Sequence, residues 1–240
     1  MIDFHTHILP DIDDGAKNET ESCAMLNKLN AQGITTICLT SHYVSYKEPL
    51  EAFLFRRTES FDKIKDYAGS LGLNLLQAAE VCLTKEISGM AEIEQLCVEG
   101  TRLLLVEVPS KMSVKEWVGN VENLVNNFDV KPVIAHIERY PKILNNNKLL
   151  NYLLKIGCLM QVNLESFDVS RPLKKRKLFK RLREGKIHFV GTDCHGLSSR
   201  PPEYNKYIEI IRQRYGDRFV KSFERKSHNH LRFNKIVQEF

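Results

Sequence analysis

The feature that most constrains the fold is a regular alternation of short apolar, β-branched runs with amphipathic stretches. The runs predict strands over 2–4, 34–38, 71–78, 103–108, 132–135, 159–162 and 187–191. Apolar residues at helical spacing predict helices over 19–32, 51–69, 113–127, 148–156, 172–184 and 203–214. This alternation favours an α/β fold with a parallel sheet, open or closed into a barrel, whose functional site lies at the carboxyl ends of the strands.

The chain is long enough for one large domain. It has 240 residues, 42% of them hydrophobic and 27% charged, which is typical of a globular protein. No linker or low-complexity segment interrupts the alternation, so we expect a single domain over 1–240.

The sequence carries no targeting or membrane signal. It opens on Met1-Ile2-Asp3 without a basic segment and an apolar core, and no later apolar run reaches the roughly 18 residues of a membrane span. Six cysteines are scattered without C-x-x-C pairing, which does not indicate a disulfide framework. We therefore expect a cytoplasmic protein that does not insert into membranes.

Positive charge is concentrated in one segment. The formal net charge is only +5, yet nine basic residues and one acid, Glu184, lie between Arg171 and Lys186. Such a run is most often a solvated helix face, and the alternative is a docking patch for an acidic or phosphorylated partner. It does not by itself indicate a nucleic-acid-binding protein.

Two histidines follow the first predicted strand at a spacing suited to chelation. In His5-Thr6-His7 the period of two places both imidazoles on the same side of the chain. Each later predicted strand but one also ends in a potential ligand, and these residues are His42, Glu80, Glu107, His136 and Asp193, the last followed by His195. Unrelated strands have no reason to agree in this way, so a shared metal site is favoured over isolated polar residues.

An acidic loop follows the histidine pair. It contains Asp11, Asp13 and Asp14 before Gly15, and we expect at least one of the three carboxylates to be a ligand. A set of imidazoles and carboxylates without thiolate suits Mn, Fe or Zn in a multinuclear site and argues against a closed structural zinc site.

These residues stand in motifs that resemble a known superfamily. The segments, in order, are DFHTHILPDIDDG, TSH, AAE, the glutamate of LVEVP, AHIERY and GTDCHGLSSRPP. They resemble the polymerase-and-histidinol-phosphatase (PHP) superfamily, and within it the bacterial tyrosine-protein phosphatases of capsule and exopolysaccharide operons. The likeness extends to about residue 215. The sequence departs from the pattern at Ala79, where glycine is usual, and at Gly196, where asparagine is frequent.

The resemblance implies a distorted seven-stranded (β/α) barrel with two or three divalent ions, Mn²⁺ above all, at the carboxyl ends of the strands. It assigns the first metal to His5, His7, Glu80 and Asp193. Glu80 would bridge to a second metal completed by Glu107 and His136. Asp14, His42 and His195 would hold a third, and Arg139 and Arg200 would bind the substrate phosphate.

The same resemblance implies a metal-dependent protein-tyrosine phosphatase. A hydroxide bridging two cations would attack phosphorus in line, with the metals and the arginine side chains stabilising the charge. The implied partner is a phosphotyrosine protein, a bacterial tyrosine kinase that controls capsule or exopolysaccharide synthesis, and not a nucleic acid. The oligomeric state and any general acid stay open.

Three alternatives compete with this reading. Cys194 and Arg200 spell C-x5-R, the motif of cysteine-dependent tyrosine phosphatases, although short motifs arise by chance and Cys194 should point away if Asp193 and His195 face the metals. A second alternative is another PHP phosphoesterase, acting on histidinol phosphate or as a nuclease. The third is a metal-bound scaffold that docks a kinase without catalysis.

Overall fold

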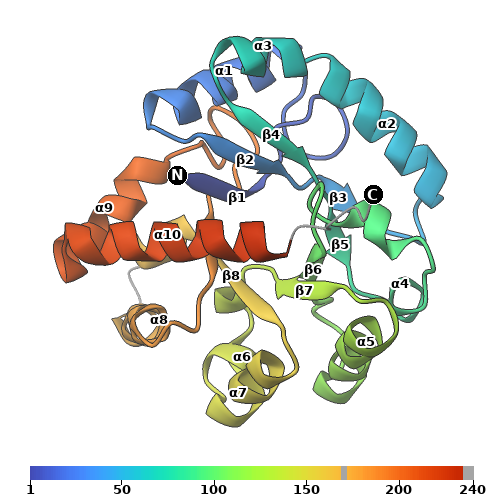
Figure 1. The fold of residues 1–240 in the computed structure, drawn as a ribbon, viewed down its shortest axis with the longest axis vertical. Helices are drawn as coiled ribbons and strands as arrows, with labels where there is room; N and C mark the ends of the chain where they lie inside the picture. Colours follow the sequence, from blue (N-terminus) through green and yellow to red (C-terminus); the bar gives the residue numbers. More distant parts are fainter. Residues whose placement is uncertain (169–171, 235–240) are drawn as a thin grey trace.

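The computed structural model describes residues 1–168 and 172–234 and confirms an α/β fold whose paired strands all run parallel. Figure 1 shows the strands at the centre, with helices around them. Within the described residues the strands are β1 (Ile2–Thr6), β2 (Thr36–Leu39), β3 (His42–Tyr43), β4 (Asn74–Gln77), β5 (Glu80–Cys82), β6 (Leu103–Glu107), β7 (Lys131–Ile134), β8 (Leu159–Asn163) and β9 (Phe189–Gly191).

The strands form two sheets that continue into each other. One has the order β1-β2-β4 and the other the order β3-β5-β6-β7-β8-β9. The end of β1 meets the segment after β9, where Thr6 bridges Cys194 and the amide of Asp193 donates to the carbonyl of His5 at 2.8 Å. The parallel sheet is therefore curled, and its first and last strands lie side by side.

Two of the predicted strand ends are instead strand starts. His42 opens β3 and Glu80 opens β5, each after a break from β2 and β4 respectively. At the second break the Glu80 amide donates to the carbonyls of Thr40 and Ser41, so the chain leaves the regular ladder there. The breaks place both side chains where the two sheets meet, which a pattern of apolar runs does not reveal.

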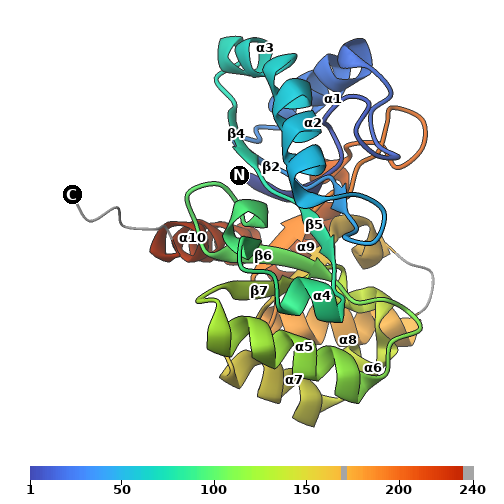
Figure 2. The same ribbon diagram turned by 90° about the vertical axis from the view of Figure 1, so that its right-hand side faces the viewer.

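Helices lie on both sides of the strands. Figures 1 and 2 show α1, α2 and α3 on one side and α5 to α8 on the other. Their bounds are α1 (Glu19–Ala31), α2 (Leu50–Asp62), α3 (Lys65–Ser70), α4 (Lys85–Ser88), α5 (Val114–Asn127), α6 (Pro141–Leu144), α7 (Asn147–Lys155), α8 (Pro172–Arg183), α9 (Tyr204–Tyr215) and α10 (Asp217–Phe233).

The helix predicted over 51–69 is wrong in one respect, because the structure divides it into α2 and α3. The division falls at Ile64, which is fully buried and accordingly turns into the core. The predicted start of α1 is confirmed, since the Asn18 side chain accepts a hydrogen bond from the Glu21 amide at 2.9 Å. Gly33, with φ +80°, follows the end of that helix.

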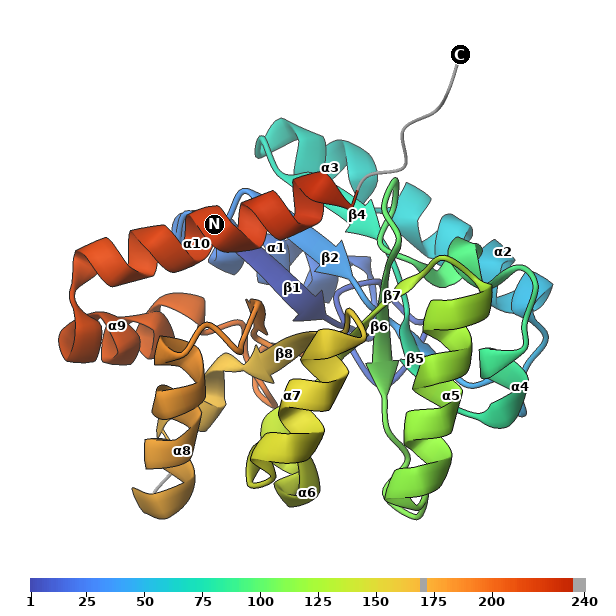
Figure 3. The ribbon, with the colours of Figure 1, turned by 60° about the horizontal axis from the view of Figure 1, so that its bottom comes forward.

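The residue pattern does not predict α10, because the helix has a low apolar content. Leu231 on α10 belongs to the same buried cluster as Ile2 and Leu103, at the starts of β1 and β6. The carbonyl of Asn234 accepts a hydrogen bond from the Arg102 amide at 2.9 Å. Figure 3 shows α10 running past the first residues of β1. The helix thus covers the amino ends of the strands and leaves their carboxyl ends uncovered on that side.

The remaining expectations concern cysteines, membrane spans and charge. All six cysteines are free thiols, four of them buried. Across 1–168 and 172–234 no helix combines the length and the apolar character needed to span a bilayer.

Most of the basic segment forms α8, while Lys186 follows the helix and Arg171 lies outside the described residues. Arg181 in this helix is buried and donates to the Leu144 carbonyl at 3.1 Å, so part of the positive charge is structural.

Candidate metal centre

The two histidines of the first strand converge as their spacing predicts. His5 lies in β1 and His7 follows its end, and both side chains are fully buried. Their Nε2 atoms are 3.2 Å apart. Each Nε2 also lies 3.4 Å from Oδ1 of Asp193. Two imidazole lone pairs and a carboxylate therefore meet at one point.

Glu80 is the centre of the cluster. Its Oε2 lies 3.1 Å from Nε2 of His5, 3.4 Å from Nε2 of His7 and 3.1 Å from Nδ1 of His42. Its other oxygen, Oε1, lies 2.7 Å from Nε2 of His136. The carboxylate is buried, so a single acidic group is surrounded by four imidazoles and has an oxygen facing each side of the centre.

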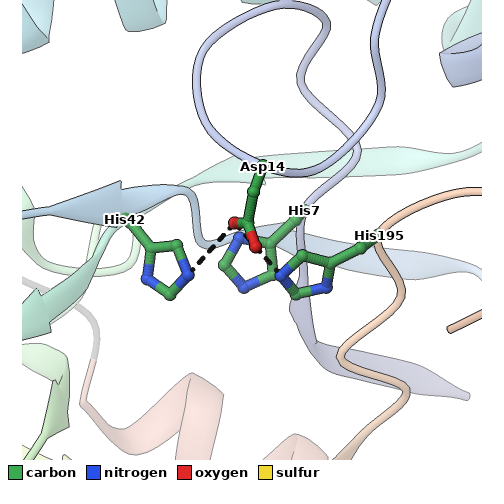
Figure 4. A group of neighbouring side chains, drawn as sticks. All are labelled: His7, Asp14, His42 and His195. Carbon is green, nitrogen blue, oxygen red and sulfur yellow. Dashed lines mark ion pairs between the residues drawn. The ribbon is translucent and has the colours of Figure 1, made fainter. Parts of the chain in front are cut away.

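A second group forms around Asp14, as Figure 4 shows. Asp14 Oδ1 lies 3.4 Å from Nε2 of His42 and 3.5 Å from Nε2 of His195. The ligand atoms of His7, Asp14, His42 and His195 all lie within 4.8 Å of one another. Asp14 points from the acidic loop toward the three imidazoles. Asp11 is exposed and does not belong to this group.

Glu107 and His136 complete the other side. Glu107 ends β6 and His136 follows β7, and Oε1 of Glu107 lies 3.5 Å from Nε2 of His136. Glu107 also groups with His42 and Glu80 within 4.8 Å. The structure therefore brings all nine predicted ligands together, although His7 and His42 each stand between two of the sets that the resemblance keeps apart.

Both predicted arginines contact the same carboxylate. Oδ2 of Asp193 accepts from Nη2 of Arg139 at 2.7 Å, and Nη1 of Arg200 lies 3.6 Å from it. Arg200 also donates to Oδ2 of Asp14 at 3.2 Å. The Arg139 side chain is 42% exposed and that of Arg200 35%, so both arginines can be reached by a ligand in solution.

Two supporting residues were not singled out from the sequence. Asn163 donates to Oδ2 of Asp193 at 2.7 Å, and Gln161 accepts from the His136 amide at 2.6 Å with its Oε1 atom. Both are fully buried on β8. The available signal was a pair of polar residues, one within the apolar run predicted over 159–162 and one directly after it. Asp13, which the sequence indicated as a potential ligand, also has a supporting role.

Asp13 orients the His7 imidazole by contacting the ring nitrogen that faces away from the cluster. Its Oδ2 lies 2.7 Å from Nδ1 of His7 and accepts from the His42 amide at 2.9 Å. Because a carboxylate on one ring nitrogen fixes the tautomer, the opposite Nε2 of His7 presents its lone pair to the cluster. Asp13 thus holds His7 in place while Asp14 faces the centre.

The charges in the cluster depend on one another. Burial alone would raise the pKa of Glu80, but the charge of His5 and hydrogen bonds from His136, His42 and His5 outweigh burial and hold that pKa well below its ordinary value. Burial would likewise lower the pKa of His7, yet its carboxylate partners raise it well above the usual value. Anionic carboxylates therefore require nearby positive charge, which protonated imidazoles or divalent cations can both provide.

The donor set fits divalent cations. Nε2 of His195 and Nδ1 of His136 are buried and have no hydrogen-bond partner among the described residues. An orphaned buried nitrogen is costly unless a ligand satisfies it, and Nε2 of His195 belongs to the Asp14 group. Imidazoles and carboxylates without a thiolate match the preferences of Mn, Fe and Zn.

Two glycines permit this close packing. A Cβ on Gly191 of β9 would lie 2.6 Å from Cβ of His5, and a Cβ on Gly15 would lie 2.2 Å from the carbonyl oxygen of His7. Neither contact is possible for a larger residue.

Three of the cluster residues adopt left-handed backbone conformations. The φ angles are +31° at His136, +53° at Asp193 and +49° at Arg200. Such conformations are rare for residues other than glycine, and they concentrate at functional sites. Those at His136 and Asp193 change the direction of the chain just after β7 and β9, where these ligands leave the sheet.

Cys194 is not placed as a nucleophile. Its side chain is fully buried and belongs to the apolar core, and burial raises the pKa of its thiol well above the ordinary value. A reactive cysteine needs access and a lowered pKa, and this one has neither. The C-x5-R motif therefore does not form a cysteine phosphatase site here.

If the chain hydrolyses phosphate esters as its motifs imply, this geometry predicts that Cys194→Ser leaves the rate within about threefold of the parent, because nothing reacts at the sulfur. The measurement is kcat/KM on an aryl phosphate, with metal content determined in parallel. Cys38→Ser, another fully buried thiol, is the control for inserting a hydroxyl into the core. A rate near zero with metals retained would favour the cysteine mechanism.

Comparison with known proteins identifies the relatives of this chain. The family profile described as "Capsular polysaccharide synthesis, CpsB/CapC" matches residues 1–231. The chain belongs to the CpsB/CapC family. It is 33% identical to the tyrosine-protein phosphatase CpsB of Streptococcus pneumoniae. The alignment spans 232 residues and covers 92% of this chain and 93% of CpsB. It is 31% identical to the tyrosine-protein phosphatase YwqE of Bacillus subtilis, covering 90% and 85% respectively.

A solved structure extends the likeness to three dimensions. It comes from work on YwqE of Bacillus subtilis and CpsB of Streptococcus pneumoniae, described as "unique metal-dependent tyrosine phosphatases". The TM-score is 0.80 at 26% identity, covering 99% of this chain and 96% of the other. The resemblance inferred from the sequence motifs to the capsule phosphatases is thus confirmed at the level of the CpsB/CapC family.

Proposed function

We propose that this chain is a metal-dependent protein-tyrosine phosphatase that acts in capsule or exopolysaccharide synthesis. The observation that carries the proposal is the buried Glu80 carboxylate, which presents one oxygen to His5, His7 and His42 and the other to His136. A carboxylate in this position can bridge two cations, which is the arrangement used for in-line attack on phosphorus. Family membership supports the choice of substrate.

The proposed cofactor is Mn²⁺ in two or three copies, with Fe or Zn as substitutes. His5, His7, Glu80 and Asp193 would hold the first ion. Glu80 would share a second with Glu107 and His136, and Asp14, His42 and His195 would hold a third. The distances among these atoms support the assignment, and the positions of His7 and His42 between groups suit ions that lie close together.

For the fold, we infer a distorted seven-stranded (β/α) barrel of the PHP type. The two broken strands, β2 with β3 and β4 with β5, count as one barrel strand each. The pairing of Thr6 with Cys194 supports closure between the first and last strands. The proposed metal site lies at the carboxyl ends, and the proposed single domain covers 1–240, of which 235–240 lie outside the described residues.

When bound, divalent cations lower the pKa of a coordinated water and neutralise phosphate charge, which supplies a nucleophile near neutral pH. The chain contributes orientation. Arg139 and Arg200 would bind phosphate oxygens through their planar guanidinium groups. Asn163 would hold Asp193 when the arginines turn from that carboxylate to the substrate. A phenolate, with a pKa of about 10, leaves with little help from an acid.

The proposed partner is a phosphotyrosine protein, namely a bacterial tyrosine kinase, and the proposed location of the reaction is the cytoplasm. The discriminating measurement compares steady-state rates on a phosphotyrosine peptide, histidinol phosphate and single-stranded DNA. The proposal expects kcat/KM to be highest on the phosphotyrosine peptide. A preference for histidinol phosphate or DNA would assign another phosphoesterase activity, and no turnover with metals bound would assign a scaffold.

Arg200→Lys is expected to lower kcat/KM about 10- to 100-fold. A lysine ammonium cannot make the paired contacts of a guanidinium, and a hydrogen bond to a charged group contributes roughly 1.5–3 kcal/mol. The measurement compares a phosphotyrosine peptide with a small aryl phosphate, and metal content should stay unchanged.

The comparison of substrates decides what Arg200 does. Equal losses on both substrates place the guanidinium on the transferring phosphoryl group. A loss on the peptide alone would move Arg200 to a protein-docking surface. No loss on either would reduce it to a structural residue that precedes Pro201 and Pro202.

A further inference from the structure

A cavity of about 700 Å³ opens beside the candidate metal centre. One wall is the loop that follows β6, and the other is the segment that leads into α6. Figure 3 shows that this loop runs from the end of β6 to the start of α5, with α6 and α7 nearby. Glu107 and Arg139 line the cavity and also belong to the candidate centre. The volume is within the range of small-ligand sites.

Large apolar side chains line both walls, and a hydrogen bond connects the two walls. Trp117 and Met112 line one side and Tyr140 the other, with Trp117 only 3% exposed. The Tyr140 hydroxyl accepts a hydrogen bond from the Val108 amide at 3.1 Å, which ties the two walls together. The Tyr140 ring lies 5.7 Å, centroid to centroid, from the ring of His136. The cavity is therefore a preformed extension of the metal centre with aromatic surfaces.

The edge of the cavity carries an unpartnered aromatic ring. Tyr46 lines it and is 74% exposed, which among the large apolar side chains of the described residues is matched only by Leu173. An exposed aromatic ring at the edge of a pocket is free to stack on the ring of a ligand.

The cavity has a charge preference. Lys111 lies on the wall formed by the loop after β6 and Lys142 lies on the α6 wall, and both are exposed. Glu107 is the only acidic residue among those that line it, and it faces His136 in the candidate centre. Two lysines on opposite walls favour an anionic chain that crosses the opening.

We propose that this cavity binds the phenyl ring of a phosphotyrosine together with acidic residues that flank it in the substrate peptide. The phosphate would lie toward Arg139, the ring between Tyr46 and Tyr140, and the flanking carboxylates on Lys111 and Lys142. This inference rests on the proposed function and adds the basis of its specificity: aryl over alkyl phosphates, and acidic over neutral sequences around the phosphotyrosine.

The first test reverses the two charges. The double variant Lys111→Glu/Lys142→Glu is expected to lower kcat/KM about tenfold on a phosphotyrosine peptide with acidic flanks, and the loss should shrink at high salt. Rates on a neutral-flank phosphopeptide and on a small aryl phosphate should stay within about twofold. Lys148→Glu, an exposed residue of α7 that does not line the cavity, is the matched control.

The second test removes the exposed ring. Tyr46→Ala is expected to lower kcat/KM about 2- to 10-fold on a small aryl phosphate, the range of an aromatic pair, and to leave a short alkyl phosphate unaffected. Equal effects on aryl and alkyl phosphates would overturn the assignment of the ring position. If Lys111→Glu/Lys142→Glu lowered kcat/KM equally on the acidic-flank and neutral-flank phosphopeptides, the proposed binding of acidic flanking residues by these lysines would be overturned.

The two proposals can fail separately. If the parent protein hydrolyses no aryl phosphate when loaded with Mn²⁺, the proposed function fails. The cavity is then tested by binding alone, using fluorescence anisotropy of an acidic peptide that carries a non-hydrolysable phosphonate analogue of phosphotyrosine. Binding weakened about tenfold by the lysine reversal supports the cavity, whereas binding that the reversal leaves unchanged overturns it.

Discussion

Glu80→Ala is expected to lower kcat on an aryl phosphate by more than about 100-fold, beyond the 10- to 100-fold typical of residues that only support metal ligands. The reason is geometric, because the Glu80 carboxylate faces His5, His7 and His42 with one oxygen and His136 with the other. Removing it takes one ligand from each of two proposed ions. The measurement is steady-state kinetics with elemental analysis of bound metal.

His195→Ala is the matched comparison, since it removes one ligand from one side of the centre. It should retain more activity and lose less metal than Glu80→Ala. Equal residual rates and equal metal content in the two variants would argue against Glu80 as the bridging group.

Removal of divalent cations is expected to abolish hydrolysis, and addition of Mn²⁺ should restore it. Without cations, the centre consists of five imidazoles and four carboxylates, and no ion is there to activate a water or to neutralise the charge of the phosphate. The measurement is the rate after dialysis against a chelator and after return of Mn²⁺, Fe²⁺ or Zn²⁺, with Mg²⁺ as a comparison. Full activity in protein shown to be metal-free would contradict the proposed function.

Most of the candidate ligands were predictable because they lie within a strand or close to its end. The carboxyl ends of parallel strands meet at one edge of a sheet, so a list of polar residues after apolar runs is also a list of neighbours. His5, Glu107 and His136 follow this logic directly. The prediction did not require knowledge of which strands pair.

Other features depend on contacts that no local pattern records. His42 and Glu80 begin strands because the chain bends before them, and only the tertiary hydrogen bonds of the Glu80 amide show this. The division at Ile64 reflects burial of one side chain in the core. Similarly, Asn163 looks like an ordinary polar residue at a strand end until Asp193 is placed 2.7 Å away.

The left-handed backbone at Arg200 has a consequence for the evolution and engineering of the chain. A residue with a Cβ in this conformation costs of order 1–3 kcal/mol, while glycine adopts it freely. Arg200 is partly exposed, so glycine there would relieve strain without opening a hole in the core. Selection for thermal stability alone should therefore discard this arginine early. If Arg200 binds the substrate phosphate as proposed, the strain at this position is the stability given up for activity, and engineering for stability should leave the loop unchanged.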